Sequence, residues 1–116
     1  METNFGEKYI PEKGDFVWLN FDPTLGHEQA GRRPAIVLSD VDYNKTIGLA
    51  IFCPITSRIK GLPFEINCDS SKISGVILSD HIKSLDWRKR NISFIGKASQ
   101  KTVNAVINNI LLIINL

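Results

Sequence analysis

One stretch of the chain, residues 20–39, gathers side chains suited to chemistry between two apolar segments. Glu28 can accept a proton, and Arg33 can present a planar set of donors to the oxygens of a phosphate. Pro34 disfavours helical backbone at the residue before it, so Arg33 is expected at the mouth of a strand. These residue types suit proton transfer beside a phosphate group.

Each of these side chains also has an ordinary structural explanation. A lone carboxylate in a loop, such as Glu28, is most often a solvated surface charge. Arg33 could instead pair with Asp15 or Asp22 across neighbouring strands, and the hydroxyl of Thr56 could simply stabilise a turn. The residue types by themselves leave both interpretations open.

Six apolar segments bounded by turn-forming residues are typical of strands. They span residues 15–22, 33–38, 48–55, 63–68, 75–85 and 93–97. The first segment carries apolar side chains on both faces, which indicates a strand buried on both sides. Residues 40–46 and 56–61 are rich in turn formers, and the spacing predicts an antiparallel meander.

One helix is expected near the C-terminus. It begins at Gln100 with Ser99 as its N-cap, and apolar residues follow with helical spacing. They are Val103, Val106, Ile107, Ile110, Leu111 and Ile114. Ile and Asn are mediocre helix formers, so this helix needs a sheet to pack on. Residues 110–114 are apolar around more than one face, which suggests contact with a second subunit.

Length and composition indicate a single domain spanning residues 1–116. The 116 residues, 43% of them hydrophobic and 22% charged, suffice for one compact core and are too few for two. The N-terminal residues are polar and lack the apolar run of a secretory signal. The most apolar segment, residues 103–116, is interrupted by asparagines and is shorter than the roughly 20 residues that cross a bilayer. We therefore expect a cytoplasmic protein without a membrane anchor.

The cysteines and histidines do not predict a metal site. Cys53 and Cys68 each lie in an apolar run and show no short pair spacing, so buried, reduced thiols are expected. Together with His27 and His81 they follow no recognisable ligand interval. Activation of either thiol by a histidine is conceivable, but no neighbouring charge marks one as a nucleophile. We expect neither a metal nor a cofactor.

The formal net charge is only +2, but the charged residues are unevenly distributed. Residues 1–57 contain five Lys and Arg against eight Asp and Glu, whereas residues 58–116 contain nine against four. The basic residues of the second half could form a surface that attracts phosphates. The residues concerned are Arg58, Lys60, Lys83, Arg88, Lys89, Arg90, Lys97 and Lys101. A solvated hairpin tip explains residues 88–90 equally well.

Three aromatic residues, Trp18, Phe21 and Trp87, could stack on unpaired bases. Aromatic residues in strands are more often part of the core, so we expect Trp18 to be buried. Trp87 stands beside the basic residues 88–90 and is expected at the surface.

Several of these segments occur in an order that resembles toxins of the MazF/PemK family. The matching segments are YIPEKGD (residues 9–15), DPTLGHEQAGRRP (22–34), CPITS (53–57), KGLPFE (60–65) and GVILSDHIKSLDW (75–87). In the PemK branch an arginine stands two residues before the position of Asp80, whereas Leu78 occupies that position here. The chain therefore resembles the MazF branch.

The resemblance implies a mostly β (α+β) fold: a small, twisted, antiparallel, barrel-like sheet of the SH3-like type with a C-terminal helix. It implies a homodimeric toxin of a type II toxin-antitoxin system that cleaves single-stranded RNA, such as mRNA, at specific sequences and thereby inhibits translation. An antitoxin with an acidic tail would hold it inactive. No metal or cofactor is implied.

The resemblance also implies roles for individual residues. Glu28 and Arg33 would be catalytic, and Thr56 would hold its hydroxyl near the substrate phosphate. Asp80 would lie in the RNA-binding groove. The further predicted RNA contacts are Arg32, Ser57, Arg58, Lys60, His81, Lys83, Trp87 and Arg88.

The chemistry of RNA fits this set of residues. The 2′-hydroxyl lies beside the scissile phosphate, so Glu28 could accept its proton while Arg33 stabilises the charge that develops. The products would carry a 2′,3′-cyclic phosphate and a 5′-hydroxyl. Two other classes remain open at this point: a CcdB-like toxin that binds gyrase and cleaves nothing, and a noncatalytic RNA-binding module.

Overall fold

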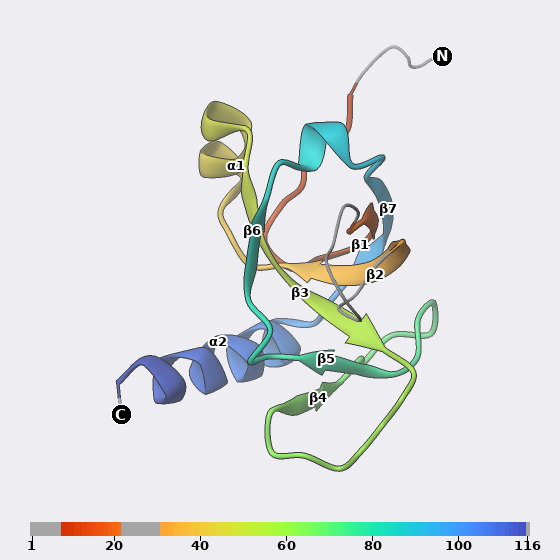
Figure 1. The fold of residues 1–116 in the computed structure, drawn as a ribbon, viewed down its shortest axis with the longest axis vertical. Helices are drawn as coiled ribbons and strands as arrows, with labels where there is room; N and C mark the ends of the chain where they lie inside the picture. Colours follow the sequence, from red (N-terminus) through yellow and green to blue (C-terminus); the bar gives the residue numbers. More distant parts are fainter. Residues whose placement is uncertain (1–7, 22–30, 116) are drawn as a thin grey trace.

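The computed structural model describes residues 8–21 and 31–115, which form a β-sheet with two α-helices and one 3-10 helix (Figure 1). The strands are β1 (Asp15–Asn20), β2 (Arg32–Val37), β3 (Ala50–Thr56), β4 (Glu65–Asn67), β5 (Val76–Leu78), β6 (Lys83–Leu85) and β7 (Ser93–Lys97). The helices are α1 (Val41–Ile47), the 3-10 helix η1 (Trp87–Lys89) and α2 (Gln100–Ile114). The predicted sheet with a C-terminal helix is confirmed.

The sheet has seven strands, and every strand pair is antiparallel. Its order is β4-β5-β3-β2-β1-β7, with β6 also paired to β3. Only β1, β2 and β3 follow one another as a meander. The predicted simple meander is therefore wrong, because β7 returns to the free edge of β1 and β5 returns to β3.

The segment 75–85 was predicted as one long strand, and the structure divides it into β5 and β6. Both strands lie along β3, where Ile55 pairs with Ile77 and Phe52 pairs with Lys83. Between these pairs, two residues of β3 lie opposite five residues of the partner segment, 78–82, and residues 79–82 belong to no strand. We call this segment the 79–82 corner. Extra residues in one strand of a pair re-aim side chains, commonly near functional sites.

Both faces of the sheet are covered, as the apolar pattern of β1 predicted. One core lies beneath α2 and contains Phe16, Ile36, Leu38, Cys53, Ile55, Ile77, Val103 and Val106. The other lies on the opposite face and contains Val17, Leu19, Phe21, Ala35, Val37, Ala50, Phe52 and Trp87. Among the described residues, polar side chains of the sheet meet solvent mainly near strand ends and at its edges.

Helix α2 begins where the sequence predicted. Ser99 accepts a hydrogen bond at its hydroxyl from the backbone N–H of Thr102, at 3.1 Å, and so caps the helix. Val103 and Val106 are buried against the sheet. Figure 1 shows the C-terminal end of α2 running out beyond the sheet at the lower left. The large apolar side chains Leu111, Leu112 and Ile114 of this end are exposed.

Helix α1 was not predicted, because residues 40–46 were interpreted as a turn. Its start and stop signals are nevertheless present. The carboxylate of Asp40 caps the first turn by accepting a hydrogen bond from the backbone N–H of Asp42, and Gly48 ends the helix in the left-handed region at φ 83°. Buried Asn44 fastens the helix by donating to the carbonyls of Pro11, at 2.8 Å, and Ser39, at 3.0 Å. The helix is short and mostly polar, so periodicity could not distinguish it from a turn.

The two tryptophan predictions were wrong. Trp87 is only 5% exposed: η1 turns its ring into the second core, and its indole N–H donates to the carbonyl of Asn44 at 3.0 Å. Trp18 is 41% exposed. Phe16 belongs to the core beneath α2, but Trp18, two residues further along the same face, does not. The burial of a strand residue thus depends on which other element packs over it, and the local sequence does not reveal this.

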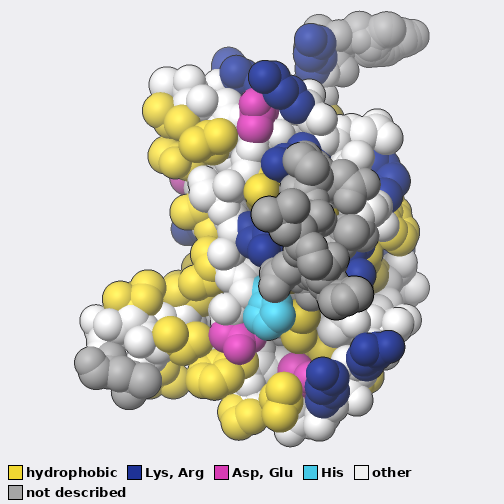
Figure 2. Space-filling model, in the orientation of Figure 1, with side chains coloured by type: hydrophobic (Ala, Val, Ile, Leu, Met, Phe, Trp, Pro, Cys, Tyr) yellow, Lys and Arg dark blue, Asp and Glu magenta, His cyan; other side chains and the backbone are white. Residues whose placement is uncertain are grey.

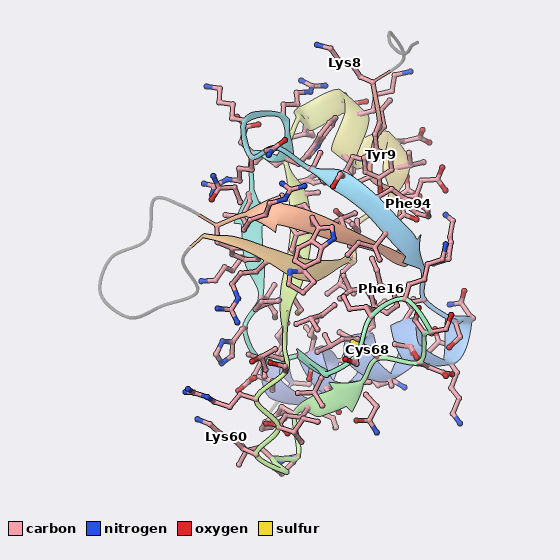
Figure 3. The ribbon with its side chains drawn as sticks, turned by 90° about the vertical axis from the view of Figure 1, so that its right-hand side faces the viewer. Lys8, Tyr9, Phe16, Lys60, Cys68 and Phe94 are labelled. Atoms are coloured by element: carbon pink, nitrogen blue, oxygen red, sulfur yellow. The ribbon has the colours of Figure 1, made fainter. Side chains whose placement is uncertain are left out.

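The N-terminal approach to β1 is held by a polar cluster. Buried Asp15 accepts hydrogen bonds from the Tyr9 hydroxyl and from the backbone N–H of Glu12, and it pairs with Lys97 of β7 at 2.8 Å. The ring of Tyr9 lies 5.9 Å from that of Phe94 on β7, and Figure 3 shows the two side by side, far from Lys60 on the loop at the other end. Among the described residues, no helix is both long and apolar enough to cross a bilayer.

Candidate active site

An open cavity of about 560 Å³ lies where β2 begins and where β3 and β5 end. It is lined by Arg33, Thr56, Ser57, Arg58, Lys60, Leu62, Phe64, Glu65, Leu78, Asp80 and His81. Figure 2 shows basic, acidic and histidine side chains gathered on the lower half of the face seen there. The structure thus brings together most of the predicted site residues that it describes.

The pairing of β2 with β3 places Arg33 beside Thr56. Ala35 pairs with Pro54, and two residues further along each strand Arg33 and Thr56 lie on the same side of the sheet. Arg33 is half-buried, and its Nε is fully covered without a hydrogen-bond partner among the described residues. A buried, unsatisfied guanidinium nitrogen is costly, and an anionic group placed beside it would be strongly favoured.

The alternative ion pair between Arg33 and Asp15 is wrong. Asp15 is committed to Lys97 and Tyr9 at the other end of β1. Asp22, the second alternative partner, lies outside the described residues, as do the predicted base Glu28 and His27.

The sequence left two interpretations of Thr56 open, a turn-stabilising hydroxyl or a site residue, and its position is compatible with both. Its hydroxyl accepts a hydrogen bond from the backbone N–H of Arg58 at 3.1 Å, which stabilises the turn after β3. The same residue lines the cavity beside Arg33. Gly75 packs directly against its backbone, where an added Cβ would lie 2.4 Å from the carbonyl oxygen of Thr56.

Glu65 was not predicted as a site residue. Its carboxylate accepts hydrogen bonds from the backbone N–H groups of Lys60, at 3.2 Å, and Gly61, at 2.9 Å. This anchors the loop after β3, which carries the exposed side chains of Arg58 and Lys60. The motif KGLPFE contains Lys60, Gly61 and Glu65 within six residues, but only the hydrogen bonds reveal the role of the Glu65 carboxylate.

The 79–82 corner contributes the opposite wall of the cavity. Asp80 and His81 are both exposed, and Asp80 Oδ1 lies 3.8 Å from His81 Nε2. The remaining wall is apolar and comes from Leu62, Phe64 and Leu78, none of which was predicted. Apolar surface between charged groups suits a ligand that has both flat bases and phosphates.

Four predicted RNA contacts lie outside this cavity: Arg32, Lys83, Trp87 and Arg88. Arg32 hydrogen-bonds the carbonyl of Asn91 and, at 2.7 Å, the hydroxyl of Ser93. Arg88 lies 5.2 Å from the centroid of the Trp87 ring and donates to the carbonyl of Lys45 at 2.6 Å. Because Trp87 is buried, the predicted stacking of its ring on an RNA base is not supported.

The cysteines are protonated thiols. Burial raises the pKa of Cys53 to about 12, with a further contribution from the charge of Asp80, and burial raises the pKa of Cys68 to about 11. Neither is a thiolate near neutral pH, so neither is activated as a nucleophile. In the described part of the chain, no three His, Cys, Asp or Glu side chains cluster closely enough to hold a metal ion.

The fold and the cavity are those of a family of small toxins. Residues 12–114 match the family model described as PemK-like, MazF-like toxin of type II toxin-antitoxin system. The chain belongs to this family, as its sequence motifs predicted.

Individual relatives agree with this assignment. The chain is 40% identical over 99 residues to the endoribonuclease toxin MazF of Escherichia coli K12, which covers 85% of this chain and 89% of that protein. The crystal structure of MazF from Deinococcus radiodurans superimposes with a TM-score of 0.88 at 44% identity, covering 94% of this chain and all of the other. A MazE-MazF structure from the same organism gives a TM-score of 0.83 at 40% identity, covering 94% of this chain and 99% of the other.

Raising the pH above about 9 should lower the free energy of unfolding. Unfolded thiols ionise near the ordinary pKa of 9.0, whereas the folded state keeps both thiols protonated to about 11 or 12. The unfolded state therefore binds fewer protons in this range, and stability falls as pH rises. The hydrogen bond of Lys97 to Asp15 is the main cause that raises the pKa of Lys97, and this raised pKa likewise makes stability fall as pH rises. Urea denaturation between pH 7 and 10.5 should show a smaller decrease in the free energy of unfolding for Cys53→Ala than for the wild type. An equal decrease in the two proteins would contradict this explanation.

Replacing Gly75 by alanine should disturb the cavity wall. Gly75 has a φ of 122°, and a Cβ there would collide with Thr56. We expect the free energy of unfolding to fall by about 3 kcal/mol, because the alanine would be strained and would displace the backbone of Thr56. Gly61→Ala is the matched control: φ is 75°, but no described atom lies within 4 Å, so only about 1 kcal/mol should be lost. Equal losses in chemical denaturation would show that contact with Thr56 is unimportant.

Proposed function

We propose that this chain is the toxin of a type II toxin-antitoxin system and acts as a sequence-specific endoribonuclease on single-stranded RNA, mRNA included. The observation that carries the proposal is the half-buried guanidinium of Arg33, whose Nε has no hydrogen-bond partner among the described residues, in an open cavity that Thr56 also lines. The relatives of this chain include proteins named endoribonucleases. Cleavage of mRNA would inhibit translation.

The proposed mechanism uses the nucleophile that RNA already carries. Glu28 accepts the proton of the 2′-hydroxyl, which attacks the adjacent phosphorus and displaces the 5′-oxygen of the next nucleotide; the departing oxygen takes a proton from water. Arg33 stabilises the extra negative charge on the phosphoryl oxygens, and Thr56 orients one of them through its hydroxyl. The products are a 2′,3′-cyclic phosphate and a 5′-hydroxyl. No step needs a metal ion or cofactor.

The cavity walls suit an unpaired strand. Ser57, Arg58 and Lys60 would bind phosphates and ribose on one side, while Asp80 and His81 on the other would contact base edges. Bases must be unstacked to reach such positions, which favours single-stranded RNA over a duplex. Arg32, Lys83 and Arg88 lie outside the cavity and would act on the approaching polyanion through their charge.

The same groove would bind the antitoxin. A cavity that accepts polyanionic RNA also accepts an acidic, disordered peptide tail, which would inhibit by occupying it. We also propose that the chain is a single-domain, cytoplasmic homodimer. The exposed Leu111, Leu112 and Ile114 at the end of α2 form an apolar surface that a second copy could cover.

One cleavage assay tests the proposed function against its alternatives. Purified protein with a long single-stranded RNA and excess EDTA should give discrete fragments, whereas matched DNA or RNA methylated at the 2′-oxygen should remain intact. A gyrase-binding toxin would leave all three intact and bind no RNA. A noncatalytic module would bind RNA without cutting it. Cleavage of the DNA, or a strict requirement for metal, would exclude the mechanism.

Arg33→Ala should lower kcat/KM for RNA cleavage by about 100- to 1,000-fold, since it removes the group that stabilises transition-state charge. Arg32→Ala is the matched control, because that side chain turns toward Asn91 and Ser93. It should lower kcat/KM by at most about tenfold, the value of a lost charged contact. Single-turnover measurements on one RNA substrate compare the two. Equal effects would contradict the assignment of Arg33.

A further inference from the structure

We propose that Asn109 of α2 is a positioning residue for the RNA groove. Acting through Ser79, it holds the 79–82 corner in the place where Asp80 and His81 meet the substrate. The part of this inference that concerns RNA rests on the proposed function, but the structural link does not.

The link consists of three hydrogen bonds at one buried residue, Ser79, two of which involve its hydroxyl. Ser79 is 0% exposed, and its Oγ donates to the carbonyl of Phe64 at 2.6 Å. The backbone N–H of Ser79 donates to the same carbonyl at 3.0 Å. Asn109 Nδ2 donates to Ser79 Oγ at 3.1 Å. The helix, the corner and the Phe64 wall therefore meet at one point.

The donors and acceptors allow only one arrangement. A hydroxyl has a single proton, and Ser79 gives it to the carbonyl of Phe64, so its oxygen must accept from Asn109. This requires the amide nitrogen of Asn109, rather than its oxygen, to face Ser79. Without Asn109 the serine would lose its donor, and no described side chain replaces it.

The position of Asn109 is itself well fixed. Its neighbours on α2, Val106 and Ile110, pack against the core beneath the helix. The amide thus extends from a rigid element to a segment that has left the sheet ladder. Residues 79–82 have no strand partner in β3, so they depend on such contacts for a defined position.

Two residues of the corner, Asp80 and His81, line the cavity together with Leu78 and Phe64. Arg33 and Thr56, in contrast, project from β2 and β3 and have no bond to Asn109 among the described contacts. Loosening the corner should therefore weaken RNA binding and leave the chemical step nearly unchanged.

The test is a double-mutant cycle in the full-length chain with Ser79→Ala, Asn109→Ala and the double variant. Asn109→Ala should raise KM for RNA by about 3- to 10-fold, the value of one hydrogen bond, with kcat within about twofold. The double variant should be no worse than Ser79→Ala, because both substitutions remove the same link.

Asn108→Ala is the matched control. It makes the same substitution on the same helix, at an exposed neighbour, and should leave KM unchanged. Alanine favours helix more than asparagine, so neither single helix variant should unfold the protein, and thermal melting verifies this. Additive effects, equal effects of the two helix variants, or a fall in kcat at constant KM would overturn the proposal.

A second measurement does not depend on activity. The amides of Ser79 and His81, bonded to the carbonyls of Phe64 and Leu78, should exchange hydrogen faster in Asn109→Ala than in wild type or Asn108→Ala. If the wild type fails to cleave RNA, the proposed function fails while the exchange rates still decide the link. If RNA is cleaved and the rates are unchanged, only the link is refuted.

Discussion

The central strand β3 is the constraint on which the site depends. One of its edges pairs with β2, which sets Arg33 beside Thr56, and the other pairs with β5 and β6. The partner segment is longer than the stretch of β3 that it follows, so residues 79–82 must leave the ladder. In a regular strand Asp80 and His81 would point to opposite faces. Outside the ladder, both side chains line the same cavity.

Because both faces of the sheet are covered, the polar side chains that line the cavity lie near the strand ends. The two cores leave little room for a polar group in mid-sheet, and the cavity forms where β2 and β3 emerge from between them. Partial burial there makes the charge of Arg33 more effective, because electrostatic interactions strengthen as water is excluded. The same burial makes an unsatisfied guanidinium unfavourable until an anion arrives. Folding of the small sheet thus leaves a partly buried cation at the cavity, where an anionic group would be favoured.

The regular elements could be predicted where local signals were complete. Strand β7 and helix α2 begin at the predicted residues, because alternation marks one and an N-cap with helical periodicity marks the other. Helix α1 was missed, since a short polar helix gives no period. The corner at 79–82 was missed for a different reason: residues 75–85 are apolar enough for one strand, and only the register along β3 divides them.

The sequence by itself determined the family, most of the strands along the chain and the residues proposed as reactive groups, because motifs and apolar spacing are local properties. Tertiary structure decided which of these groups share a cavity. It placed Arg33 within the cavity and Arg32 outside it, buried Trp87 and exposed Trp18, and joined Asn109 to the corner. These outcomes depend on strand register and on which element covers each face, and both are set by contacts between residues far apart in the chain.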